Sequence, residues 1–256
     1  MSTPVGLSPE TSNWQGILRC ARYAFGPNRL HYCGPDVGHE VAAHLAAKDG
    51  DLGLQHILGQ FRTLYPYLRL IAEANKIMDP FDERVIEAYW LGNKLLEAVS
   101  RRQLYNLLLE GQHLKDKLGN KLFNRVTDTL GQGAVPHHSF HVLDVWRHTG
   151  HHDQPQTVAT LAECLISWGT VTAIDGPTIT VKGEYLSYRA GQLYLAELES
   201  RSLRRRLEAD YEIEQLKTGD IITIHWGVPC EIINSAQAAS LKAYTWRHLQ
   251  LANQTI

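Results

Sequence analysis

Two separate segments of the sequence carry the side chains best suited to metal chemistry. Cys164 opens the segment Cys-Leu-Ile-Ser-Trp-Gly-Thr-Val, and His225 lies in the later segment Gly-Asp-Ile-Ile-Thr-Ile-His-Trp-Gly. A thiolate is a soft, strongly donating ligand that suits iron, and a neighbouring imidazole can bind the same ion or take the thiol proton. We therefore expect Cys164 and His225 to form a metal site, with Cys230 as a candidate second thiol. The alternative is that both cysteines are buried apolar residues and that His225 is a core histidine with a satisfied hydrogen bond.

The two segments resemble the signature segments of the HypC/HupF family, the small chaperones of nickel–iron (NiFe) hydrogenase maturation. That family begins with a Cys-Leu-x-x-x-Gly-x-Val strand and later has a Gly-Asp-x-Val-x-x-His-x-Gly strand. In this sequence Gly169 and Val171 occupy the matching positions of the first segment. An Asp175-Gly176 turn between the two segments and a helix after them also match, so the resemblance covers about residues 163–245.

The resemblance implies a small antiparallel β-barrel closed by a C-terminal helix. It also implies that Cys164 coordinates the iron of an Fe(CN)2CO group, or of a precursor, and that His225 lies beside the iron. The implied partners are a maturation scaffold protein and the hydrogenase large subunit, between which the iron fragment is passed. The sequence departs from the family in two respects. Cys164 is internal, so it has no free amino group, and Trp168 stands near a position where the family often has proline.

A histidine-rich stretch offers a second candidate metal site. His137 and His141 are four residues apart, and Asp144 and His148 repeat that spacing. Residues four apart on a helix point to the same side, so these four side chains are expected to line one face and to bind zinc or non-haem iron. The apolar residues between them equally fit a core segment, in which case the histidines are only polar residues at its surface.

Two further groups of polar residues are weaker candidates. Arg29, His31 and Cys33 lie in a loop rich in aromatic, glycine and proline residues. Such loops often carry function, and these residues either recognise an anion such as cyanide or phosphate or pack between domains. Glu73 and Glu87 lie on otherwise apolar helices, and paired helical carboxylates with histidines can build a di-iron site. The simpler interpretation is that both glutamates face water.

The first part of the chain has the periodicity and capping signals of helices. Asp51 is a suitable N-cap for the helix that follows it. Asp79 and the proline after it predict one long helix over residues 80–99. Ser100 and Gln103 form a capping-box pattern at the start of the next helix.

The sequence pattern changes after residue 155. An Asp-Gly turn between two β-rich runs predicts a hairpin. The predicted strands cover residues 170–174, 178–182, 192–198 and 221–226, and Asn234 with Gln237 begins a last helix. We therefore predict an α+β protein with two domains. Residues 1–155 form an all-helical domain, and residues 156–256 form a HypC-like, OB-like antiparallel β-barrel with a terminal helix.

Composition argues against several classes of function. The chain has 256 residues and a formal net charge of −2, so no basic field attracts nucleic acid and no polybasic segment suggests a membrane surface. It has no apolar run of membrane-spanning length and no glycine-rich nucleotide-binding motif, and we expect no secretory signal. Its four cysteines are too few for a disulfide framework, and we expect reduced thiols in the cytoplasm.

These observations favour one function over two alternatives. The leading function is a hydrogenase maturation accessory protein that binds an iron fragment through Cys164, with His225 assisting, and delivers it or docks to a partner. The first alternative is an enzyme with non-haem iron in the helical domain that makes a ligand such as carbon monoxide for the iron centre. The second is a non-catalytic scaffold in which neither site binds a metal. The helical half also resembles uncharacterised bacterial proteins, from which no site is transferred.

Overall fold

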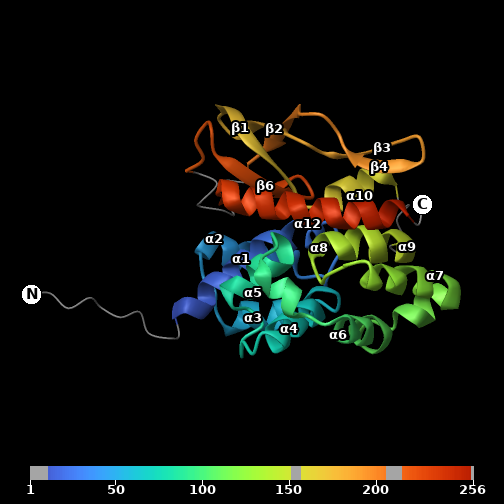
Figure 1. Cartoon of the computed structure of the whole chain (residues 1–256). Helices are drawn as coiled ribbons and strands as arrows, with labels where there is room; N and C mark the ends of the chain where they lie inside the picture. Colours follow the sequence, from blue (N-terminus) through green and yellow to red (C-terminus); the bar gives the residue numbers. More distant parts are fainter. Residues whose placement is uncertain (1–10, 151–156, 206–214, 255–256) are drawn as a thin grey trace, which may run out of the picture.

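The protein combines a helical layer with antiparallel sheet, as predicted for the α+β class (Figure 1). The computed structural model describes residues 11–150, 157–205 and 215–254. The helical layer is formed by the first part of the chain, and the long C-terminal helix α12 (Ser235–Asn253) runs between it and the strands. None of the described helices is long and apolar enough to cross a membrane.

The helices before α12 are mostly short. They are α1 (Thr11–Asn28), α2 (Gly38–Ala47), α3 (Leu52–Gly59), α4 (Leu64–Ala74), α5 (Glu83–Trp90), the 3-10 helix η1 (Lys94–Ala98), α6 (Arg101–Asn106), the π-helix η2 (Leu107–Gly111), α7 (Leu114–Gly131), α8 (His138–Phe140), the π-helix η3 (His141–Trp146), α9 (Arg147–Thr149) and α10 (Val158–Cys164).

Several helix starts follow the local signals in the sequence. The side chain of Asp51 accepts a hydrogen bond from the backbone of Leu54 at 2.8 Å and so caps α3. Ser100 with Gln103 and Asn234 with Gln237 form capping boxes at the starts of α6 and α12. These three predictions are confirmed. The sequence could predict these caps because each depends only on residues within one helical turn.

The prediction of one long helix over residues 80–99 is wrong. Helix α5 begins after Asp82, and the separate η1 begins after Asn93, whose side chain caps the backbone of Leu95 at 3.0 Å. Between them Gly92 has φ of +86°, a left-handed conformation that ends the helix and that glycine adopts at little cost. A side chain there would also collide with the ring of Tyr244 on α12.

The main sheet is antiparallel and has the strand order β5-β2-β1-β6-β7. Its strands are β1 (Ser167–Asp175), β2 (Thr178–Gly183), β5 (Glu199–Arg204), β6 (Ile221–His225) and β7 (Val228–Ile233), and a second sheet pairs β3 (Leu186–Arg189) with β4 (Gln192–Leu195). The predicted hairpin at Asp175-Gly176 is confirmed, with Asp175 paired to Thr178. The strand predicted over residues 192–198 ends at Leu195.

The predicted β-barrel is not formed by the described residues, whose main sheet stays open. One physical reason lies in the β3–β4 hairpin, which leaves the main sheet and packs near α10 and α12. The side chain of Asn253 binds both backbone groups of Leu193, at 2.9 and 2.8 Å, so the end of α12 satisfies polar groups of β4 that a barrel would pair with another strand.

The largest hydrophobic cluster includes residues from both predicted domains. The largest cluster of buried side chains includes Ile17 and Phe140 from the first part and Trp168 and Cys230 from the second. The boundary predicted between residues 155 and 156 lies outside the described residues. A buried ion pair adds to the contact, because Arg19 on α1 binds Glu231 on β7 at 2.8 Å.

Candidate metal centre

Three potential metal ligands from distant parts of the chain meet between the helices and the sheet. His138 begins α8, Cys164 ends α10 and His225 ends β6. Each offers one ligand atom, and these atoms lie within 4.8 Å of one another. A single ion can reach all three at ordinary bond lengths with small side-chain adjustments. Among the described residues no other group of three histidine, cysteine or acidic side chains meets this spacing.

The backbone brings the two sequence-predicted ligands together. Cys164 does not open a strand as expected but closes α10, which a capping box of Thr157 and Thr160 begins. The N–H of Trp226 then donates to the carbonyl of Glu163 at 2.9 Å. Because these two residues directly adjoin His225 and Cys164, this bond holds the end of β6 against the end of α10.

The hydrogen bonds of His225 prepare its ring for metal binding. Its Nδ1 donates to the carbonyl of Tyr23 at 2.7 Å, since a carbonyl can only accept. The neutral ring therefore carries its lone pair on Nε2, which is buried and has no hydrogen-bond partner. Burial lowers the pKa of His225 to about 4, so the ring is neutral at physiological pH. A histidine oriented by a carbonyl on one nitrogen and free on the other matches the usual arrangement of a metal ligand.

His138 is a potential ligand that the sequence did not predict. Its Nε2 donates to the carbonyl of Cys164 at 2.9 Å, and its Nδ1 lies 3.3 Å from the hydroxyl of Tyr89. A metal would take Nδ1 in place of the longer contact, or take Nε2 after displacing the carbonyl. Burial lowers the pKa of His138 well below its ordinary value, with the nearby His225 contributing. The histidine-rich stretch indicates a metal site in this region, but the four-residue spacing within it favours the neighbouring His137 and His141.

The thiol of Cys164 is neutral in the absence of a metal. Burial raises its pKa well above the ordinary value, with Cys33 adding to the rise and Trp226 opposing it. A coordinated metal ion deprotonates a thiol outright, so the raised pKa does not prevent binding. The ligand set is therefore two neutral imidazoles and one latent thiolate, a combination that suits iron and also zinc.

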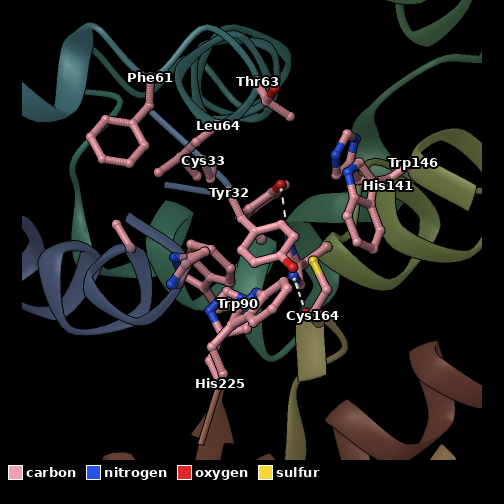
Figure 2. Close-up of a pocket in the computed structure, with 15 residues that line it drawn as sticks. Tyr32, Cys33, Phe61, Thr63, Leu64, Trp90, His141, Trp146, Cys164 and His225 are labelled. Atoms are coloured by element: carbon pink, nitrogen blue, oxygen red, sulfur yellow. Dashed lines mark hydrogen bonds between the residues drawn. The ribbon is translucent and has the colours of Figure 1, made fainter. Parts of the chain in front are cut away.

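The cluster lines a small cavity of about 60 Å³ (Figure 2). Its walls are mainly apolar and aromatic, and they include Trp90, whose ring lies 4.6 Å from that of His138 and 5.6 Å from that of His225. Tyr32 and Trp226 stack at 4.0 Å between centroids at another part of the wall. The site is thus shielded from bulk water on most sides but has space next to the ligands.

The second predicted set, His137, His141, Asp144 and His148, is not brought together as one group of ligands. His137 is turned toward Ser139, with 2.7 Å between its Nδ1 and the hydroxyl, whereas His141 lines the cavity. His148 contacts Arg147, 3.1 Å away. The physical reason is that residues 141–146 form a π-helix, whose wider turn does not keep residues four apart on one side. Asp144 is buried, and burial raises its pKa to about 8.

The loop candidates are divided between the cavity and the surface. Cys33 lines the cavity, and burial raises its pKa to about 11. Arg29 reaches the carbonyl of Trp226 at 3.4 Å, just outside the cavity wall. His31 is exposed and lies 3.3 Å from Asp36. Of these residues, Cys33 is the one next to the metal ligands.

The remaining candidates have structural partners. Glu73 is exposed and pairs with Arg69 at 2.9 Å. Glu87 binds Arg19 at 3.3 Å and also accepts from the side chain of Gln237, so it does not form a di-iron site with Glu73. Cys230 is buried in the core, and its thiol donates to the carbonyl of Val228 at 3.4 Å.

The fold and the site define an α+β protein with a buried His-Cys-His cluster at the junction of its helical and sheet layers. The chain belongs to a family of unknown function, DUF6390, whose model matches residues 12–256. The match spans all three ligands and both layers. No curated protein and no solved structure matches the chain.

Proposed function

We propose that this protein binds an iron fragment at His138, Cys164 and His225 and serves as a metallocentre-assembly protein in NiFe-hydrogenase maturation. The observation that carries the metal site is the convergence of three ligand atoms within 4.8 Å, beside an unpartnered Nε2 of His225. An imidazole nitrogen with no partner in a buried site costs free energy, which a bound ion would recover.

The number of ligands supports a carrier of a partly coordinated ion. Three protein ligands leave open coordination positions on a tetrahedral or octahedral ion. The cavity lies next to those positions, so additional small ligands on the ion fit inside the protein. A closed structural site would have four protein ligands and no such space.

The assignment to hydrogenase maturation depends on the resemblance of the two sequence segments to the HypC/HupF family. Support for it comes from Cys164 and His225, the two residues that the resemblance singles out, because both belong to the cluster. The open sheet departs from the barrel of that family, and His138 on a helix has no counterpart in the two segments. In this proposal the iron fragment is cargo, which passes between a maturation scaffold protein and the hydrogenase large subunit.

The test is anaerobic purification of the full chain from cells that also express hydrogenase maturation proteins. Metal analysis and infrared spectra in the region of metal-bound cyanide and carbon monoxide are compared between the wild type and Cys164→Ala. The matched control is Cys20→Ala, which removes a buried thiol outside the cavity. We expect iron and infrared bands in the wild type and the control, and neither in Cys164→Ala.

The possible outcomes separate the two parts of the proposal. Stoichiometric iron without infrared bands would leave a metal-binding protein and remove the hydrogenase assignment. Zinc in place of iron would have the same consequence. Full metal content in Cys164→Ala, or a metal-free wild type after loading, would overturn the site itself.

A further inference from the structure

A third histidine lines the same cavity without belonging to the ligand cluster. His141 lines the cavity together with the three proposed ligands, and its ring lies 6.4 Å from that of His138 between centroids. For comparison, the rings of His138 and His225 are 5.1 Å apart. Figure 2 shows His141 beside Trp146, across the cavity from His225. His141 therefore lies further from His138 than His225 does.

His141 has an unused hydrogen-bonding atom. Its Nδ1 is buried and has no hydrogen-bond partner among the described residues. The ring packs edge-on against Tyr67, at 5.8 Å between centroids, which fixes its position without satisfying that nitrogen. An unpartnered buried polar atom is costly, so a hydrogen-bond partner for this lining residue would recover free energy.

The charge of the loaded site indicates which kind of ligand this would be. A divalent ion that is held by one thiolate and two neutral imidazoles and has no further ligand carries a net charge of +1. No aspartate or glutamate is among the described residues that line the cavity. A buried, uncompensated positive charge in apolar surroundings is unfavourable, and a small anion bound to the ion would neutralise it.

We propose that the cavity binds a small exogenous monoanion on the metal ion and that His141 is a positioning residue that donates a hydrogen bond to the anion's far end. A linear anion of two or three atoms fits within the cavity volume of about 60 Å³. This inference rests on the metal site of the proposed function and adds the class of ligand and a residue that recognises it.

The test uses the full chain loaded with Co(II), whose visible spectrum reports on coordination, and azide as the probe. Azide affinity is measured for the wild type, for His141→Phe, which keeps a ring without an N–H group, and for His141→Gln, which restores a donor. The matched control is His148→Phe, because His148 is a neighbouring histidine outside the cavity. Loss of a hydrogen bond to an anion should weaken azide binding about tenfold in His141→Phe.

Each outcome distinguishes this inference from the metal site beneath it. We expect unchanged cobalt stoichiometry in all variants, a shifted infrared stretch of bound azide in His141→Phe, and at least partial recovery in His141→Gln. Equal azide affinity in the wild type and His141→Phe, or no azide binding to the cobalt-loaded wild type, would overturn the inference alone. Failure of the wild type to bind cobalt would overturn both proposals.

Discussion

The N–H of Trp226 donates to the carbonyl of Glu163 at 2.9 Å, and this backbone bond joins the residues next to two proposed ligands. The carbonyl of Tyr23 orients His225, and the carbonyl of Cys164 accepts from His138. The site is therefore held largely by main-chain groups. The positions of the proposed ligands therefore depend on how α1, α10 and β6 pack against one another.

His138→Leu should lower metal affinity about a hundredfold or more while the protein stays folded. Loss of groups that only orient a ligand typically lowers affinity 10–100-fold, and loss of a ligand should cost at least as much. Competition with a chelator measures the affinity, and circular dichroism checks the fold. His148→Leu is the control. If His138→Leu binds metal as tightly as the wild type does, the third ligand has been misassigned.

Gly26→Ala should destabilise the protein and weaken metal binding together. A Cβ atom on Gly26 would stand 2.5 Å from the carbonyl oxygen of His225 and 3.2 Å from Cβ of Trp226, so α1 must move away from β6. Overpacking of this kind typically costs about 1–3 kcal/mol. The control is Gly59→Ala, since nothing lies within 4 Å of that position. Urea denaturation and metal titration of both variants provide the comparison, and an unchanged metal affinity in Gly26→Ala would contradict the prediction.

Arg19→Met and Glu231→Met should each lower the free energy of unfolding. The sum of these two losses should exceed the loss in the double variant. The side chains of Arg19 and Glu231 are 14% and 8% exposed, and Tyr23 also donates to Glu231 at 2.6 Å. Removing Arg19 leaves the buried Glu231 carboxylate without its cation, at a typical cost of about 3–5 kcal/mol, and removing Glu231 leaves Arg19 with only the longer contact to Glu87. Replacing both removes the two charges together. A double-mutant cycle by urea denaturation measures the coupling. Strictly additive losses would show that the pair is not coupled.

Asp144 should make the protein less stable as the pH rises through the weakly acidic range. Burial raises its pKa in the folded protein to about 8, against 3.8 for an ordinary aspartate, with Arg147 opposing the shift. Folding therefore retains a proton that the unfolded chain loses above pH 3.8. The stabilisation by the buried, protonated carboxyl is complete below pH 3.8. As the pH rises further, the free energy of unfolding falls by up to about 1.4 kcal/mol per pH unit until the carboxyl of the folded protein also ionises.

Asp144→Asn provides the measurement for this pH dependence, because the amide resembles the protonated carboxyl and does not titrate. Thermal or urea unfolding of both proteins is compared between pH 4 and 8. The variant should gain stability relative to the wild type across this window and hold that difference above it. A constant difference over the whole range would mean that the folded Asp144 titrates normally.

Local features of the fold followed from the sequence, whereas features that depend on distant contacts did not. The hairpin at Asp175-Gly176 and the capping boxes at Ser100 and Asn234 involve neighbouring residues, and all three were predicted. The break at Gly92 was missed because the residue that fills the adjacent space, Tyr244, belongs to the C-terminal helix.

The candidate site shows the same division between local and distant information. Cys164 and His225 were predicted as partners because two recognisable segments contained them. His138 was not, because the four-residue spacing assumed a regular α-helix for a stretch that includes a π-helix, and because its contacts with Cys164 and Tyr89 arise only from packing. No periodicity in a single sequence encodes that contact.

The three proposed ligands are synthesised in a fixed order. During synthesis His138 leaves the ribosome first, Cys164 follows, and His225 comes last of the three. A nascent chain that has not reached residue 225 contains at most two of the three proposed ligands and lacks a complete β6, which ends at His225. At the proposed site, capture of a metal by all three ligands would therefore begin only after β6 has been synthesised, so a loaded protein would be one whose translation had passed His225.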